Sequence, residues 1–288
     1  MNRYIRVVES MRGINLLGIV FILIFANVWH VSAVTNHALI ILEPVSYAKV
    51  TVLVDNNPFK EGMSTAWGIS MYVETSSDEL LFDAGPDPKL LTKNAEKLGV
   101  SLEDLNAVFI SHGHGDHVGG LEALVGKKLT VYIPTDKALA EYVRSLRFKV
   151  IVLNETTVIS RGFISTGPMY GPPYEQALGI YVKDLGLIVL TGCSHPGVEN
   201  IVRYLHNVTG LKIYAVIGGF HLIGANERRL EEVKKVFEEL NVTKVYPIHC
   251  TGDSARKYFK EELGNRYGDG GVGLELEFTA HNSSMIKG

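Results

Sequence analysis

The chain has 288 residues, of which 46% are hydrophobic, and its formal net charge is −3 at pH 7. About 250 residues follow an apolar N-terminal segment, which is enough for one large α/β domain. The charge balance argues against a nucleic-acid-binding protein, because such proteins carry a positive surface that neutralises phosphates.

The N-terminal segment, residues 1–33, is typical of a targeting sequence. Basic residues precede an unbroken apolar run at 16–26, and the small residues of a cleavage site follow at 31–33. A membrane-spanning helix needs about 20 apolar residues, so this run favours a signal peptide over an uncleaved membrane anchor. We therefore expect a protein that is exported or associated with a membrane, and a cytoplasmic one if the segment is not a true signal.

The folded domain is expected to span residues 45–280. Alternating apolar residues predict strands at 49–54, 68–74 and 79–83. Helical spacing of leucine and alanine predicts a helix at 88–98 that ends at Gly99 as its C-cap. A capping box predicts a second, short helical start at 101–104.

Three histidines and an aspartate follow the apolar run at 107–110, as His112-Gly-His114-Gly-Asp116-His117. Alternate residues of an extended chain point the same way, so His112 and His114 can bind one metal ion. Asp116 and His117 stand where a helix begins and can face a second ion, and we also expect Asp116 to take part in catalysis. Imidazole and carboxylate ligands suit zinc, and iron or manganese is chemically possible.

Helices and strands alternate after this string. Helices are predicted at 118–125, 136–146, 198–205, 227–240 and 254–263. Strands are predicted at 128–134, 149–153, 178–182, 187–190, 212–217, 244–248 and 272–278. Residues 165–176 are rich in proline and glycine and are predicted to form a loop, either at the mouth of an active site or as a plain connector.

Three later motifs place ligand-type side chains directly after predicted strands: Gly-Cys193-Ser-His195, Gly-Gly-Phe-His221 and Pro-Ile-His249-Cys250. We expect His195 and His249 to bind metal. His221 can bind metal, act as a general acid or contact an anionic substrate, and a purely structural role stays open.

The two cysteines allow two interpretations. A disulfide would suit an exported protein. We favour a thiolate at Cys193 beside the metal, with Cys250 as a small buried filler.

The order of these motifs resembles the metallo-β-lactamase superfamily. Asp83 after its strand, the string that begins at His112, the strand before Cys193 and the strand before His249 follow one another as they do there. The resemblance implies an α/β protein with the αβ/βα sandwich fold, in which two mixed β-sheets pack together and helices cover the outer faces. It also implies that Asp83 orients the metal loop by hydrogen bonds without binding metal, and that Cys193 stands in the place of the bridging ligand.

One departure from that family concerns the third ligand of the first metal. Many members carry a histidine before the second-half hairpin, whereas this sequence has none between His117 and Leu187. Tyr174-Glu-Gln176 stands there instead. His195 is the natural substitute, because it follows the end of a strand beside the site.

The resemblance implies a metal-dependent enzyme, and we expect a hydrolase whose metal-bound hydroxide attacks an ester, phosphoester or amide of a small anionic substrate. The motifs around Cys193, His221 and His249 resemble more narrowly the dihydropterin–ribofuranosylaminobenzene phosphate synthases of archaea. That branch implies a transferase that condenses a dihydropterin methyl diphosphate with ribofuranosylaminobenzene phosphate. A non-catalytic metal-binding module is the third alternative.

Overall fold

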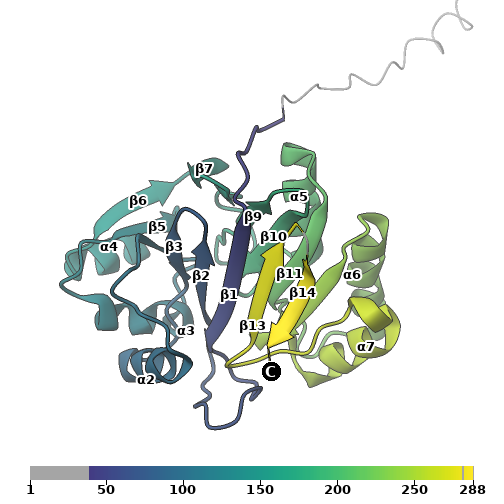
Figure 1. Ribbon diagram of the computed structural model, residues 1–288, viewed down its shortest axis with the longest axis horizontal. Helices are drawn as coiled ribbons and strands as arrows, with labels where there is room; N and C mark the ends of the chain where they lie inside the picture. The colour runs from purple at the N-terminus through teal and green to yellow at the C-terminus, as the bar shows by residue number, and fades with distance from the viewer. Residues whose placement is uncertain (1–38, 281, 288) are drawn as a thin grey trace, which may run out of the picture. The chain divides into compact units, whose positions relative to one another are not determined.

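Two β-sheets organise residues 39–280 and 282–287, the part of the chain that this computed structural model describes (Figure 1). The larger sheet contains β1 (Tyr47–Val54), β2 (Ser70–Thr75), β3 (Glu79–Phe82), β4 (Ala107–Phe109), β5 (Thr130–Pro134), β6 (Lys149–Leu153), β13 (Glu275–Thr279) and β14 (Asn282–Lys287). The smaller sheet contains β7 (Thr157–Ser160), β8 (Phe163–Ser165), β9 (Leu178–Val182), β10 (Gly186–Thr191), β11 (Ile213–Gly219) and β12 (Lys244–Ile248).

Both sheets are mixed. The larger has the order β14-β13-β1-β2-β3-β4-β5-β6, and the smaller has the order β12-β11-β10-β9-β8-β7. Strands β3 to β6 pair in parallel, as do β10, β11 and β12. Parallel strands end at the same edge of a sheet, so the loops after β4, β10, β11 and β12 can meet.

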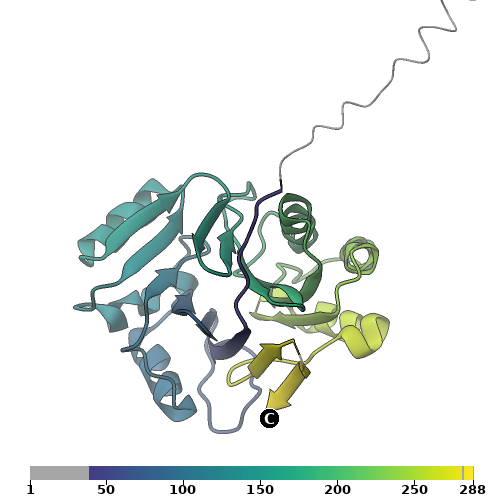
Figure 2. The same ribbon diagram turned by 45° about the horizontal axis from the view of Figure 1, so that its top comes forward.

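Helices cover the outer faces of the two sheets. Helices α2 (Pro88–Leu98), α3 (Gly115–Val118) and α4 (Lys137–Ser145) belong to the first half, and α5 (Val198–Thr209), α6 (Glu227–Glu239) and α7 (Asp253–Leu263) belong to the second. Short 3-10 helices occupy η1 (Gly119–Leu124), η2 (His249–Thr251) and η3 (Gly264–Arg266). Figure 2 shows the helices of the two halves on opposite sides of the sheets.

The core between the sheets is apolar. Val50 and Val52 of β1 are fully buried and belong to the same cluster as Ile188 and Ile217 of the smaller sheet. The next residue, Leu53, points the other way and packs in the cluster beneath α2 and α4. Burying each such side chain stabilises the fold by roughly 1.5–3 kcal/mol. The expected αβ/βα sandwich is confirmed, with the domain continuing to β14.

The local structure differs from the expectations in three places. Residues 101–104 form no helix, because the hydroxyl of Ser101 accepts the Glu103 N–H at 3.2 Å and closes only a turn. The helix expected at 118–125 is mostly the 3-10 helix η1, preceded by α3. Strands β7, β8 and β14 were not predicted; β7 is largely half-buried and lacks a regular apolar alternation.

The predicted targeting segment at 1–33 lies outside the described residues. No helix within the described residues has the length and apolar character of a membrane span.

Candidate metal centre

The ligand-type side chains lie in loops that directly follow four parallel strands. His112, His114, Asp116 and His117 follow β4; Cys193 and His195 follow β10; His221 follows β11; and His249 follows β12. The structure brings all eight together in groups whose donor atoms lie within 4.8 Å of one another. The two halves of the fold therefore contribute to one site.

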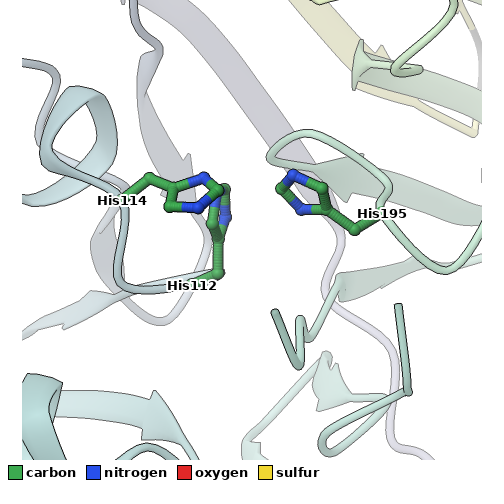
Figure 3. Close-up of side chains that lie close together, drawn as sticks. All are labelled: His112, His114 and His195. Carbon is green, nitrogen blue, oxygen red and sulfur yellow. The ribbon is translucent and has the colours of Figure 1, made fainter. Parts of the chain in front are cut away.

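The first group, which we call the outer group, consists of His112, His114 and His195. His112 Nε2 lies 2.9 Å from His114 Nδ1, and the His195 ring lies 4.7 Å from the His112 ring. Figure 3 shows His195 approaching the other two from the opposite loop. Burial lowers the pKa of His112, and partial loss of water together with the neighbouring His195 lowers the pKa of His114. A neutral imidazole has a nitrogen lone pair that can bind a cation.

Glu175 holds His195 in place. One of its oxygens accepts His195 Nδ1 at 2.7 Å, and the carboxylate also accepts the backbone N–H groups of Cys193, Ser194 and His195. Burial disfavours the charge of Glu175, but its hydrogen bonds to His195 outweigh burial and lower its pKa. The carboxylate thus leaves Nε2 of His195 free to face the outer group.

The second group, which we call the inner group, consists of Asp116, His117 and His249. Asp116 Oδ2 lies 3.5 Å from His117 Nε2 and 3.7 Å from His249 Nε2. Burial opposes a charge on His117, but Asp83 and Asp116 outweigh it and raise the pKa of His117 to about 10. Burial lowers the pKa of His249 to about 3. The surroundings of the two rings therefore differ: carboxylates favour the protonated form of His117, and burial favours the neutral form of His249.

Asp83 supports the loop from behind, and it is not a member of any ion-facing group. Its carboxylate accepts the Ser111 backbone N–H and hydroxyl and bonds His117 Nδ1, each at 2.7 Å. These bonds fix the His117 ring so that Nε2 points inward, as second-layer carboxylates commonly do for metal-binding histidines.

Asp55 and Asn56 support His249 from the loop after β1. Asp55 accepts the His249 backbone N–H at 2.7 Å, and Asn56 Oδ1 lies 2.8 Å from His249 Nδ1. Burial raises the pKa of Asp55 to about 7. Sequence reasoning missed both roles and that of Glu175. The one signal in the sequence was the departure from the resembled pattern, in which Tyr174-Glu-Gln176 lies near the place expected for a third histidine.

The two cysteines are free thiols and form no disulfide. Cys193 Sγ lies 3.3 Å from His117 Nε2 and 3.6 Å from His249 Nε2, and it also groups with His112. It therefore stands between the outer and inner groups. Cys250 is more than the buried filler we expected: its sulfur accepts the His221 N–H at 3.3 Å and groups with Cys193 and His221.

Backbone strain concentrates at this site. Asp83, Ser194, His221 and His249 all have φ between 45° and 63°, a region that non-glycine residues rarely adopt. Such strain persists where the surrounding structure holds residues in place, and it is common at functional sites.

The donor set fits transition metals. Three imidazoles form the outer group, and a carboxylate with two imidazoles forms the inner group, with the Cys193 sulfur between them. Nitrogen, oxygen and sulfur donors of this kind suit zinc best. The remaining predicted residue, His221, is exposed, and its ring lies 4.6 Å from that of His195. It therefore sits at the mouth of the centre.

The model of the metallo-beta-lactamase superfamily matches residues 68–240. The chain is 27% identical over 249 residues to the 7,8-dihydropterin-6-methyl-4-(beta-D-ribofuranosyl)-aminobenzene-5'-phosphate synthase of Methanocaldococcus jannaschii, covering 68% of this chain and 84% of that protein.

Two solved structures share the fold. One is a metal-dependent hydrolase of the beta-lactamase superfamily, with 31% identity and a TM-score of 0.70 over 81% of this chain and 99% of that one. The other is the metallo-beta-lactamase fold protein YhfI from Bacillus subtilis, with 18% identity and a TM-score of 0.59 over 81% of this chain and all of that one.

Proposed function

The chain belongs to the metallo-beta-lactamase superfamily, and we propose from this premise that it is a metal-dependent hydrolase of a small anionic ester, phosphoester or amide. The observation that carries the proposal is the outer group beside the inner group, with Cys193 between them. A structural metal site needs only four closed ligands, and two adjacent open groups exceed that need.

The side chains have distinct tasks in this proposal. His112, His114 and His195 would hold one ion, and Asp116, His117 and His249 the other. Ions held in this way supply an activated water at neutral pH and neutralise negative charge that develops on the substrate.

His221 is placed to handle a proton. Its hydrogen bond with Cys250 raises the pKa of the ring, which favours the imidazolium form more than in a free histidine. An exposed imidazolium at the mouth can pair with the anionic part of the substrate or donate a proton to the leaving group.

The test is hydrolysis of a panel of phosphoesters, lactones and thioesters by the zinc-loaded protein. The double variant His112→Ala, His114→Ala is the control, because it removes two of the three outer donors. We expect turnover of at least one class of ester by the parent protein and none by the variant. Equal turnover by both proteins would overturn the proposal.

The second candidate function is the transferase reaction. The observation that favours it is the similarity to the archaeal synthase, which extends over 84% of that protein. Incubation of the metal-loaded protein with the dihydropterin diphosphate and ribofuranosylaminobenzene phosphate distinguishes the two functions. Release of diphosphate with a condensed product would support the transferase.

Localisation bears on the same choice. We propose that residues 1–33 direct export or anchoring, on the strength of their basic start and apolar run. Pterin precursors are cytosolic, so an exported enzyme would not meet them. Expression of the full chain, followed by N-terminal sequencing of the cell-surface and soluble fractions, tests this proposal; a full-length cytosolic protein would refute it.

A further inference from the structure

Exposed hydrophobic side chains gather around the candidate metal centre. Eight large hydrophobic residues are exposed in residues 39–280, and four of them lie in loops beside the centre. These four are Trp67 (51% exposed), Tyr170 (71%), Tyr174 (48%) and Ile223 (61%). Exposed apolar surface of this kind, close to a polar site, marks binding of an apolar group.

Trp67 is fixed beside the inner group. Its ring lies 5.0 Å from the His249 ring at an angle of 54°. The next two residues are tied to the metal loop, because a Cβ on Gly68 would meet the Asp116 carbonyl oxygen at 2.4 Å and the Ile69 N–H donates to the same oxygen. The backbone next to Trp67 is therefore held against the metal loop, while half of the surface of Trp67 is open.

A small cavity opens beneath this indole. It has a volume of about 80 Å³ and is lined by Trp67, His221, Ile223 and Cys250. An engineered apolar cavity of about 150 Å³ binds benzene, so this smaller, open one can take the edge of a single ring. The cavity thus has apolar side chains on one side and His221 on the other, and the His221 ring contacts His195 of the outer group.

Two tyrosines stand near the outer group. The Tyr170 and Tyr174 rings lie 5.3 Å apart, and Met169 and Glu175 exchange backbone hydrogen bonds at 2.8 and 3.1 Å. A Cβ on Gly171 would lie 2.3 Å from the His195 carbonyl, so this turn packs directly on His195. Aromatic side chains therefore flank both sides of the centre.

We propose that the substrate carries a flat aromatic ring, which packs between Trp67 and Ile223 beside His221, while its anionic ester faces the ions. Among the described residues that line the cavity there is no lysine or arginine, and its two largest side chains, Trp67 and Ile223, offer an apolar wall that suits a ring beside His221. A nucleic-acid strand would need such cations along its phosphates, which favours a small aromatic ester. This inference takes the ester from the proposed hydrolase function, whereas the ring site is inferred from the structure alone.

The chain offers a direct reporter for this ring site. Its two tryptophans are Trp29 and Trp67, so Trp29→Phe leaves Trp67 as the single indole. Its fluorescence then reports occupancy without any turnover. The probes are phenylphosphonate and methylphosphonate, which share an anionic head, lack a cleavable ester and differ in the ring.

We expect phenylphosphonate to change the Trp67 fluorescence of the zinc-loaded Trp29→Phe protein and to bind about tenfold more tightly than methylphosphonate. Ile223→Ala should remove most of this preference. Trp67→Ala should also remove most of this preference, with binding measured by calorimetry because the indole is absent. Trp67→Phe should keep the preference for phenylphosphonate. Val158→Ala is the matched control, because Val158 is an exposed apolar residue on the edge strand β7.

Equal affinity for the two phosphonates would overturn the inference. So would a phenyl preference that survives both Trp67→Ala and Ile223→Ala. The inference and the proposed function can fail separately. A ring preference without turnover of any ester refutes the hydrolase alone, and ester turnover without a ring preference refutes the ring site alone.

Discussion

The outer and inner groups are built from the same kinds of side chain, yet they differ in exposure and charge. His114 of the outer group is exposed and His195 is half-buried, whereas His117 and His249 of the inner group are fully buried. Burial leaves His112 neutral, while Asp83 gives His117 a pKa of about 10. The difference lies in the residue behind each ring: His112 Nδ1 meets the Ser111 hydroxyl at 3.0 Å, and His117 Nδ1 meets a carboxylate.

The comparison predicts that the inner group depends most on its support. Asp83→Ala would leave His117 Nδ1 and the Ser111 N–H buried without their shared partner. Removing one partner of a buried pair costs about 3–5 kcal/mol, so we expect a loss of that order in the free energy of unfolding. Urea denaturation of the metal-free variant measures it. A loss below about 1 kcal/mol would show that the pair contributes little stability.

Glu175→Gln should act on the outer group alone. The amide keeps part of the hydrogen bonding to residues 193–195 but removes the charge that orients His195. Loss of such a second-layer carboxylate typically lowers metal affinity about 10- to 100-fold. Competition with a chromophoric chelator should show weaker binding of one zinc ion and unchanged binding of the other.

A matched control is available elsewhere in the chain. Glu199 is also a buried glutamate, but it pairs with Arg229 on α6. Glu199→Gln should leave both zinc affinities unchanged. If Glu175→Gln weakens both ions equally, the two groups are not independent, and the comparison between them breaks down.

Cys193→Ser should affect both groups, because the sulfur stands between them. A hydroxyl is a poorer zinc ligand than a thiolate, and we expect a loss of about tenfold in the affinity for each ion. In the parent protein, Cys193 should resist alkylation until a chelator removes the metal. Mass mapping that finds rapid alkylation of the zinc-loaded protein would refute its role as a ligand.

The ligands and the residues that support them also differ in how well the sequence predicts them. Four ligand-type residues fall within six positions, 112–117, so the string itself predicts an ion site. The supports of the later ligands come from distant turns: Glu175 is 20 positions from His195, and Asp55 is 194 positions from His249. Neither local periodicity nor motif spacing predicts such contacts, because only the folded sheets bring them together.

The strands that were predicted and the strand that was missed differ in burial. Long apolar runs such as those of β1, β10 and β11 were predicted because both of their faces are buried. Strand β7 was missed because it is short and partly exposed, so it gives no clear alternation. Tertiary pairing rather than local propensity decides such edge strands.

The last and smallest effect is the pH dependence of zinc binding, best measured in the Cys193→Ser background so that this thiol does not titrate. His117 has a folded pKa of about 10, raised above its usual value, so at pH 7 it holds a proton that the inner ion must displace. Zinc affinity of the inner group should therefore rise with pH, by about threefold from pH 7.0 to 7.5. The outer group should show no such rise, because the pKa values of His112 and His114 are already lowered in the fold.

Zinc affinity of the inner group should rise with pH, whereas the contribution of His117 to the stability of the metal-free protein should fall. A raised folded pKa means that the proton on His117 stabilises the fold fully below the unfolded pKa of about 6.5, and that this contribution is lost as pH rises through about 10.

Calorimetric zinc titration in two buffers of different ionisation heat counts the protons that zinc displaces. Release of about one proton with the inner ion, and of none with the outer ion, is the result expected from the carboxylate behind His117. If the two ions release protons equally, Asp83 does not set the difference between the groups.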